Sequence, residues 1–190
     1  MKRWNATIVS WIIIILFLVL LFYVYNEWSG EHRLYIDDDA PLPDGLHPIV
    51  EENQNELIEI AASVGIDVII TQGFRSFEQQ DSLYEQGRTK PGDIITNAQG
   101  GQSYHNYGLA IDYALRNQNG EIIWDIHYDG NNNGHSDWFE VADIAKELGF
   151  DWGGDWSNFK DYPHLQMTFG LSLSELQRGY RPPEDNLSDE

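Results

Sequence analysis

Three residues of types that often bind metal ions lie in the second half of the chain: His105, Asp112 and His164. Two neutral imidazoles and one carboxylate can hold zinc and leave a fourth position for water, as in catalytic zinc sites. Water bound there becomes a nucleophile at neutral pH. These residue types do not decide the matter alone, because a single histidine is more often a surface or core residue, and aspartates in an acidic chain are mostly solvated.

Short strands would have to position these side chains. His105 precedes the apolar run LAIDYAL (109–115), which contains Asp112, and His164 begins HLQMTF (164–169). Both runs have the length and composition of strands, so neighbouring strands could bring the three side chains together. Asp161, three residues before His164, could then reach the bound water and act as a general base.

The other segments predict interspersed helices and strands. Helices are expected around 57–64, over 77–86 behind a capping-box pattern, over 138–148 and over 172–179. Strands are expected at 66–71, 109–115 and 121–126, the last two as a hairpin around the turn RNQNG. The pattern indicates the α+β class, with a small antiparallel sheet and flanking helices.

An almost unbroken apolar run, IVSWIIIILFLVLLFYVY, occupies residues 8–25. Its length predicts one N-terminal transmembrane helix. Lys2 and Arg3 then place residues 1–7 in the cytoplasm and the rest outside, as a single-pass protein of the cell membrane. A cleaved signal peptide is the alternative, although no small-residue cleavage site follows. We expect a linker over 26–47, one domain over 48–180 and a disordered polar tail over 181–190.

The chain is strongly acidic, with a formal net charge of −20 over 190 residues. All 31 acidic residues lie at or beyond Glu27, together with nine of the eleven basic ones. This charge argues against a nucleic-acid partner. The absence of cysteine excludes disulfides, thiolate metal sites and cysteine nucleophiles. We expect a monomer.

A second ion site is suggested by DGNNNGHSDWFE, residues 129–140. The segment matches the EF-hand loop template at every specified position, with Asp129, Asn131, Asn133, Gly134 and Glu140. Calcium prefers such oxygen ligands, and position seven would contribute the backbone carbonyl of His135. The preceding residues favour a strand rather than a helix, so an Asn/Gly-rich turn that happens to fit remains the alternative.

Several motifs follow one another in the second half of the chain. The pattern S-x-H-x-x-G-x-A-x-D begins at Ser103 and contains His105 and Asp112, and it is followed by GGDW and D-Y-P-H-L-Q. With these motifs the chain resembles the M15 zinc peptidases. The upstream segment GFRSFEQQDSLYEQGR (73–88) fits the same family. Within it, the chain is similar to the L-alanyl-D-glutamate endopeptidase branch, in the right order over residues 48–170.

The resemblance implies a Hedgehog/DD-peptidase-like fold and hydrolysis of peptidoglycan stem peptides outside the membrane, facing the cell wall. It assigns zinc to His105, Asp112 and His164, the general base to Asp161, and substrate binding or oxyanion stabilisation to Arg75. Ser103, Tyr104 and Trp156 are expected to contact the substrate, with core packing as the alternative for the two aromatic residues. A D-alanyl-D-alanine carboxypeptidase and an inactive calcium-dependent wall-binding module are the alternative functions.

Overall fold

The computed structural model describes residues 6–30, 34–36 and 41–183. Two helices lead into the domain, α1 (Ala6–Gly30) and α2 (Pro48–Ser63), and three more follow, α3 (Phe77–Glu85), α4 (Asp137–Glu147) and α5 (Leu173–Gln177). The strands are β1 (Leu34–Tyr35), β2 (Asp67–Gln72), β3 (Ala110–Arg116), β4 (Ile122–Ile123), β5 (Asp151–Trp152), β6 (His164–Gln166) and β7 (Tyr180–Arg181). Short 3-10 helices cover Tyr104–Tyr107 (η1) and Gly153–Asp155 (η2).

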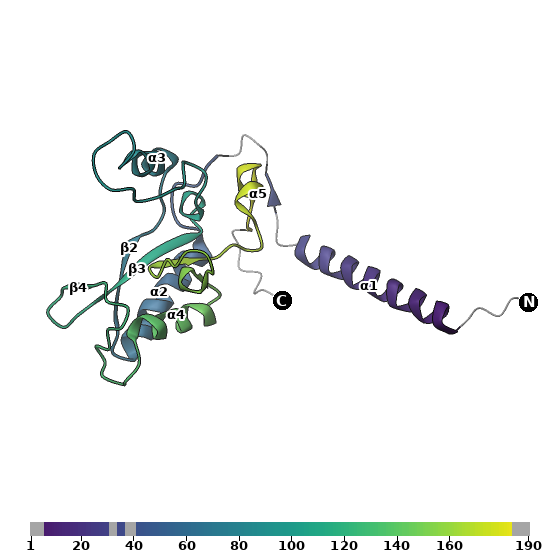
Figure 1. The fold of residues 1–190 in the computed structure, drawn as a ribbon, viewed down its shortest axis with the longest axis horizontal. Helices are drawn as coiled ribbons and strands as arrows, with labels where there is room; N and C mark the ends of the chain where they lie inside the picture. The colour runs from purple at the N-terminus through teal and green to yellow at the C-terminus, as the bar shows by residue number, and fades with distance from the viewer. Residues whose placement is uncertain (1–5, 31–33, 37–40, 184–190) are drawn as a thin grey trace, which may run out of the picture.

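Helix α1 extends away from the other elements (Figure 1). A membrane span takes about 20 consecutive apolar residues, and the structure describes the side chains of residues 9–25 of this helix. Among the described residues, no helix combines the length and the apolar character that crossing a membrane requires. This finding overturns the predicted transmembrane helix over 8–25, and with it the single-pass membrane localisation and the membrane as a partner.

A five-stranded antiparallel sheet forms the centre of the domain. Its order is β2-β3-β6-β5, with β4 also paired to β3. Strand β2 occupies one edge of β3 over Asp112–Arg116, so β6 and β4 pair with the other edge at its two ends. The register shifts between Ile70 and Gln72, opposite Tyr113 and Asp112. This bulge therefore lies beside one of the candidate zinc ligands.

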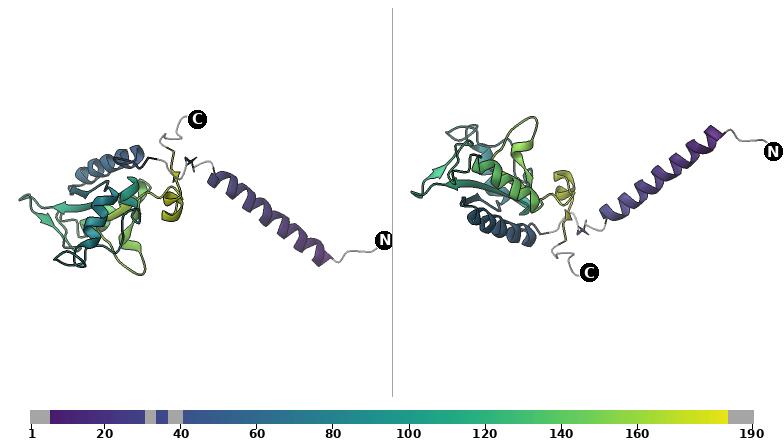
Figure 2. Two further views of the ribbon diagram at one scale, coloured as in Figure 1. Left: turned by 90° about the horizontal axis from the view of Figure 1, so that it is seen from above. Right: turned by 90° about the horizontal axis from the view of Figure 1, so that it is seen from below.

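Side chains of β3 alternate between two environments. Ile111 and Tyr113 are fully buried, whereas Asp112 between them is only partly buried on the opposite face. Helices α2 and α4 pack side by side (Figures 1 and 2), with α2 against β2 and α4 against β5. Their buried residues Leu57 and Val141 belong to the same apolar core as Ile111 and Tyr113. Asp112 thus points away from the part of the core that Ile111 and Tyr113 join.

Most predicted elements are present, with shifted ends. The capping box before α3 is formed, since Ser76 Oγ accepts from Gln79 N (3.2 Å) and Gln79 Oε1 accepts from Ser76 N (2.9 Å). The strand predicted at 121–126 is reduced to β4, because Asp125 starts a turn in which its side chain accepts from His127 N. Part of the segment 26–47, predicted as a linker, forms β1, which pairs with β7. Residues 1–5 and 184–190 lie outside the described part of the chain.

Candidate active site

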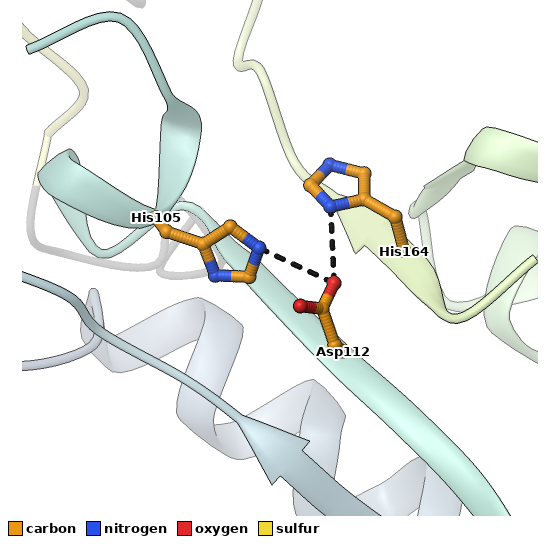
Figure 3. A group of neighbouring side chains, drawn as sticks. All are labelled: His105, Asp112 and His164. Carbon is orange, nitrogen blue, oxygen red and sulfur yellow. Dashed lines mark hydrogen bonds and ion pairs between the residues drawn. The ribbon is translucent and has the colours of Figure 1, made fainter. Parts of the chain in front are cut away.

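His105, Asp112 and His164 meet at one end of the sheet. Asp112 on β3 is the direct cross-strand partner of His164 on β6. His105 comes from η1, immediately before β3. In Figure 3 the Asp112 carboxylate lies between the two imidazole rings. The ligand atoms that the three side chains offer all lie within 4.8 Å of one another, and no other such His/Cys/Asp/Glu group occurs among the described residues.

The conformation of η1 places His105. Ser103 caps this short helix, with its hydroxyl accepting from His105 N at 3.4 Å. Gly108 ends it at φ +70°, a left-handed conformation that favours glycine. A β-carbon on Gly108 would collide with the carbonyl oxygen of Gly45 and lie 2.9 Å from His47 N. The turn between His105 and β3 therefore requires glycine at position 108.

In His105 and His164, the ring nitrogen that faces away from Asp112 (the outer nitrogen) has its own acceptor, and the other (the inner nitrogen) faces Asp112. His105 Nδ1 donates to the carbonyl oxygen of Gly73 at 2.8 Å, and His164 Nε2 donates to Gln166 Oε1 at 3.0 Å. A carbonyl oxygen can only accept, so the proton of neutral His105 is held on Nδ1. Such second partners fix the tautomer and the orientation of metal-binding histidines. The inner nitrogens are then free to present their lone pairs toward Asp112.

The two inner nitrogens and the Asp112 carboxylate are arranged to bind a cation. His105 Nε2 lies 3.3 Å and His164 Nδ1 lies 3.2 Å from the same oxygen, Asp112 Oδ1. At these distances the two nitrogen lone pairs and the negatively charged carboxylate oxygen repel one another unless a positive charge lies between them. Two imidazole nitrogens and one carboxylate oxygen are the donor set that zinc accepts in open sites. The residues present therefore fit a zinc ion.

The acidic groups of the site differ in their surroundings. Burial alone would raise the pKa of Asp112, but His105 and His164, when protonated, donate hydrogen bonds to it from their inner nitrogens and hold that pKa well below its usual range. Burial raises the pKa of Asp161, an effect that neighbouring His164 opposes and Asp112 reinforces. Asp112 is thus suited to remain a carboxylate, whereas Asp161 is better suited to exchange a proton.

A cleft of about 560 Å³ opens over these residues. Its lining includes every residue predicted from the sequence for zinc, catalysis and substrate contact: Arg75, Ser103, Tyr104, His105, Asp112, Trp156, Asp161 and His164. Trp156 packs on the ring of His164, with centroids 5.2 Å apart. The hydroxyl of Tyr104 donates to the carbonyl of Leu171 at 2.9 Å, so this tyrosine is tied to the wall of the cleft.

Two glutamines were missed by reasoning from the sequence. Gln166 holds the outer nitrogen of His164, as described above. Gln80 of α3 is fully buried, and its Oε1 accepts from Arg75 Nη1 at 2.8 Å, while its Nε2 donates to the carbonyl of Ala98 at 2.8 Å. Arg75 Nη2 lies 3.9 Å from Asp112 Oδ2. A fully buried glutamine in a short polar helix carries no signal in a single sequence that distinguishes it from its exposed neighbours.

The residues predicted for calcium lie elsewhere. Loop 129–140 leads into α4 and includes its first turn, and it contributes nothing to the cleft lining. Asp129, Asn131, Asn133 and Glu140 are joined there by hydrogen bonds, with Asn133 Nδ2 donating to Glu140 Oε1 at 2.7 Å. The structure therefore separates the two groups of predicted ion ligands.

Comparisons with known proteins identify the family of this chain. The model of an M15 peptidase family described as D-alanyl-D-alanine carboxypeptidase matches residues 96–167. Over 158 residues the chain is 60% identical to the peptidoglycan L-alanyl-D-glutamate endopeptidase CwlK of Bacillus subtilis (strain 168), an overlap of 82% of this chain and 93% of that protein. The chain therefore belongs to the M15 family of zinc-dependent peptidases. The resemblance inferred from the motifs is confirmed.

Other matches are more distant. The L-alanyl-D-glutamate peptidase of Listeria phage A118 is 32% identical over 114 residues, which is 60% of this chain and 35% of that protein. The solved structure of the L-Ala D-Glu endopeptidase ChiX of Serratia marcescens matches with 26% identity and a TM-score of 0.44, covering 66% of this chain and 82% of that one.

Proposed function

We propose that this protein hydrolyses the bond between L-Ala and D-Glu in peptidoglycan stem peptides, in a zinc-dependent reaction that serves cell-wall turnover. The observation that carries the proposal is the group of His105, Asp112 and His164, with ligand atoms within 4.8 Å of one another inside a cleft. The choice of bond is supported by the 60% identity to a protein named as an L-alanyl-D-glutamate endopeptidase, nearly all of which the chain covers.

His105 Nε2, an oxygen of Asp112 and His164 Nδ1 would hold the zinc ion. Zinc bound there supplies a Lewis acid that activates water and polarises the scissile carbonyl. Gly73 and Gln166 contribute indirectly, because their oxygens hold the outer ring nitrogens at 2.8 and 3.0 Å. The protein thereby presents three preoriented donors, which lowers the cost of ordering the site when substrate arrives.

Asp161 is the proposed general base. Its carboxylate lines the same cleft as the three metal-binding side chains, and burial raises its pKa. A carboxylate with a raised pKa takes a proton from the attacking water more readily than a fully solvated one. The same carboxyl group then returns the proton to the amine of D-Glu as the peptide bond breaks, so the base is regenerated.

Arg75 is proposed to bind an oxygen of the substrate. Its side chain is 13% exposed, lines the cleft and is fixed by Gln80 Oε1 at 2.8 Å. Burial lowers the pKa of the guanidinium and Asp112 raises it, but arginine starts so far above neutral pH that it keeps its charge. A positioned cation can bind the substrate carboxylate or the oxyanion that develops on the scissile carbonyl. Ser103, Tyr104 and Trp156 would contact the rest of the peptide.

The competing activity is that of a D-alanyl-D-alanine carboxypeptidase, the description carried by the matching family model. Digestion of purified muropeptides with the zinc-loaded protein, followed by mass spectrometry, separates the two. We expect a disaccharide that carries only L-Ala, together with a peptide that begins with D-Glu. Loss of a terminal D-Ala alone would replace our proposal by the carboxypeptidase, and uncleaved muropeptides would favour a binding module. The calcium ion predicted at 129–140 is a separate proposal, because the matched descriptions do not name calcium and this hydrolysis does not use it.

A further inference from the structure

We propose that the loop of residues 129–140 binds one calcium ion, which fixes the start of α4. This inference goes beyond the hydrolysis of peptidoglycan and does not depend on it. The sequence match to the EF-hand template first suggested the site, and the conformation of the loop together with one buried carboxylate now supports it.

The first half of the loop already has its side-chain oxygens directed toward its own backbone. Asp129 accepts from Asn133 N at 3.1 Å and from Gly134 N at 3.0 Å. Asn131 Oδ1 accepts from Asn133 N at 3.1 Å, and Asn133 Oδ1 accepts from His135 N at 2.8 Å. Positions one, three and five of the template thus lie on the inner side of the turn. Gly134, at position six, has φ +87°, the conformation that the sharp turn requires.

An independent observation comes from Asp137, which occupies position nine. Its side chain is 2% exposed, and one oxygen accepts from Gly130 N at 3.0 Å within the loop. The other oxygen is buried and has no hydrogen-bond partner among the described residues. Burial raises the pKa of this carboxyl group, and the charges of Glu140 and Asp129 add to the effect. A buried carboxylate oxygen without a donor is unfavourable, and a bound cation removes that penalty.

Glu140 closes the loop from the first turn of α4. Its Oε1 accepts from Asn133 Nδ2 at 2.7 Å and its Oε2 from Asn131 Nδ2 at 3.4 Å, so the carboxylate already faces positions three and five. Position twelve is where an EF-hand loop supplies a carboxylate that binds through both oxygens. Half of the proposed ligands are amide and main-chain oxygens, which calcium accepts alongside carboxylates.

Oxygen ligands from six positions favour calcium over zinc and magnesium. Zinc prefers nitrogen and sulfur, and magnesium demands a small regular octahedron, whereas calcium accepts six to eight oxygens in a flexible arrangement. The ligands would be the side chains of Asp129, Asn131, Asn133, Asp137 and Glu140 with the main-chain carbonyl of His135. The partner is therefore a calcium ion taken from solution.

The site would act on the zinc centre through two aromatic residues at the start of α4. Trp138 packs on Tyr113, with ring centroids 4.9 Å apart, and Tyr113 follows Asp112 in β3. Phe139 packs edge to face on Trp152, whose Nε1 donates to the carbonyl of Tyr162 at 2.8 Å. A calcium ion that orders the first turn of α4 thus stabilises the packing beneath Asp112 and beside the segment that holds His164.

Calorimetric titration of the zinc-loaded full chain with CaCl₂ tests the proposal. We expect one ion per chain and a calcium-dependent rise in the midpoint of thermal unfolding. The variants Glu140→Gln and Asp137→Asn should each weaken binding at least about tenfold, because each removes a charged ligand. Glu147→Gln, an exposed residue near the end of the same helix, is the matched control and should bind as the wild type does.

Three outcomes would overturn the inference. The first is a folded, zinc-loaded wild type that shows neither heat nor a shift in unfolding temperature up to about 10 mM calcium. The second is a Glu140→Gln variant that binds as tightly as the wild type, which would leave an adventitious ion only. The third is unchanged binding by Asp137→Asn, which would remove the buried carboxylate from the site. Circular dichroism without calcium verifies that both variants fold, and none of these readouts uses hydrolysis.

Discussion

Replacement of Gly153 by alanine should disturb the catalytic segment while leaving every proposed zinc ligand and the proposed base in the sequence. A β-carbon built on Gly153 would lie 3.0 Å from Asp161 Cβ and 3.2 Å from His164 Cβ, and closer still to the carbonyl oxygen of Asp161. Carbon atoms in contact prefer a separation of about 3.5 to 4.0 Å. Asp161 and His164 would therefore have to move by about 0.3 to 1 Å relative to η2.

A displacement of that size costs about 10²-fold in rate when it affects catalytic groups. We therefore expect kcat/KM for Gly153→Ala to fall about 100-fold, which corresponds to about 2.7 kcal/mol of lost transition-state stabilisation. Overpacking should also lower the free energy of unfolding by about 1 to 3 kcal/mol. Release of the peptide from purified muropeptides gives the rate, and metal analysis of the same sample gives the zinc content.

Gly45→Ala is the matched control. No atom lies within 4 Å of a β-carbon built there, and its φ lies outside the left-handed region, so the same added methyl group meets open space. The control should keep wild-type activity within about twofold. A Gly153→Ala protein that is as active as this control would refute the close approach of η2 to Asp161 as a constraint on the site.

Further predictions concern the chemistry and the core. Asp161→Asn should lower kcat by about 10² to 10⁴-fold with unchanged zinc content, because it removes the base but no ligand, whereas Asp155→Asn on the exposed side of η2 should be near wild type. Arg75→Lys should lower kcat/KM at least about tenfold, since an ammonium group cannot reproduce the fork that Gln80 holds, and equal activity would remove Arg75 from substrate binding. Chelation of zinc should abolish cleavage and lower the unfolding temperature, and added zinc should restore both; activity that survives with no metal found would contradict a zinc mechanism. Leu57→Ala should cost about 2 to 5 kcal/mol in urea unfolding because this side chain is fully buried, and an unchanged midpoint would place it outside the core.

The sequence predicted best those parts of the structure that depend only on residues close together in the chain. The capping box of Ser76 and Gln79 and the start of α4 are local, and both are present. The convergence of His105, Asp112 and His164 could be predicted only in outline, from the strand character of two runs and the resemblance to a family. The actual pairing of Asp112 with His164 depends on the register of β3 and β6, which is set by long-range contacts.

The missed features depend on the tertiary arrangement of side chains. Gln166 is significant because its oxygen lies beside His164 Nε2, and Asp137 because one of its oxygens is buried without a donor. Gly153 is required only because another part of the chain passes close to it. The long apolar run at 8–25 was judged by hydropathy alone, and the predicted span was not found among the described residues.

The cross-strand pairing of Asp112 and His164 has a consequence for the mechanical integrity of the domain. These two residues are 52 positions apart in a chain that has no cysteine with which to form a disulfide. A divalent ion held by both would clamp the ends of that long segment and restrict the unfolded ensemble, much as a covalent cross-link does. A cut by a protease between the two strands would then leave fragments that stay joined until the metal is stripped away.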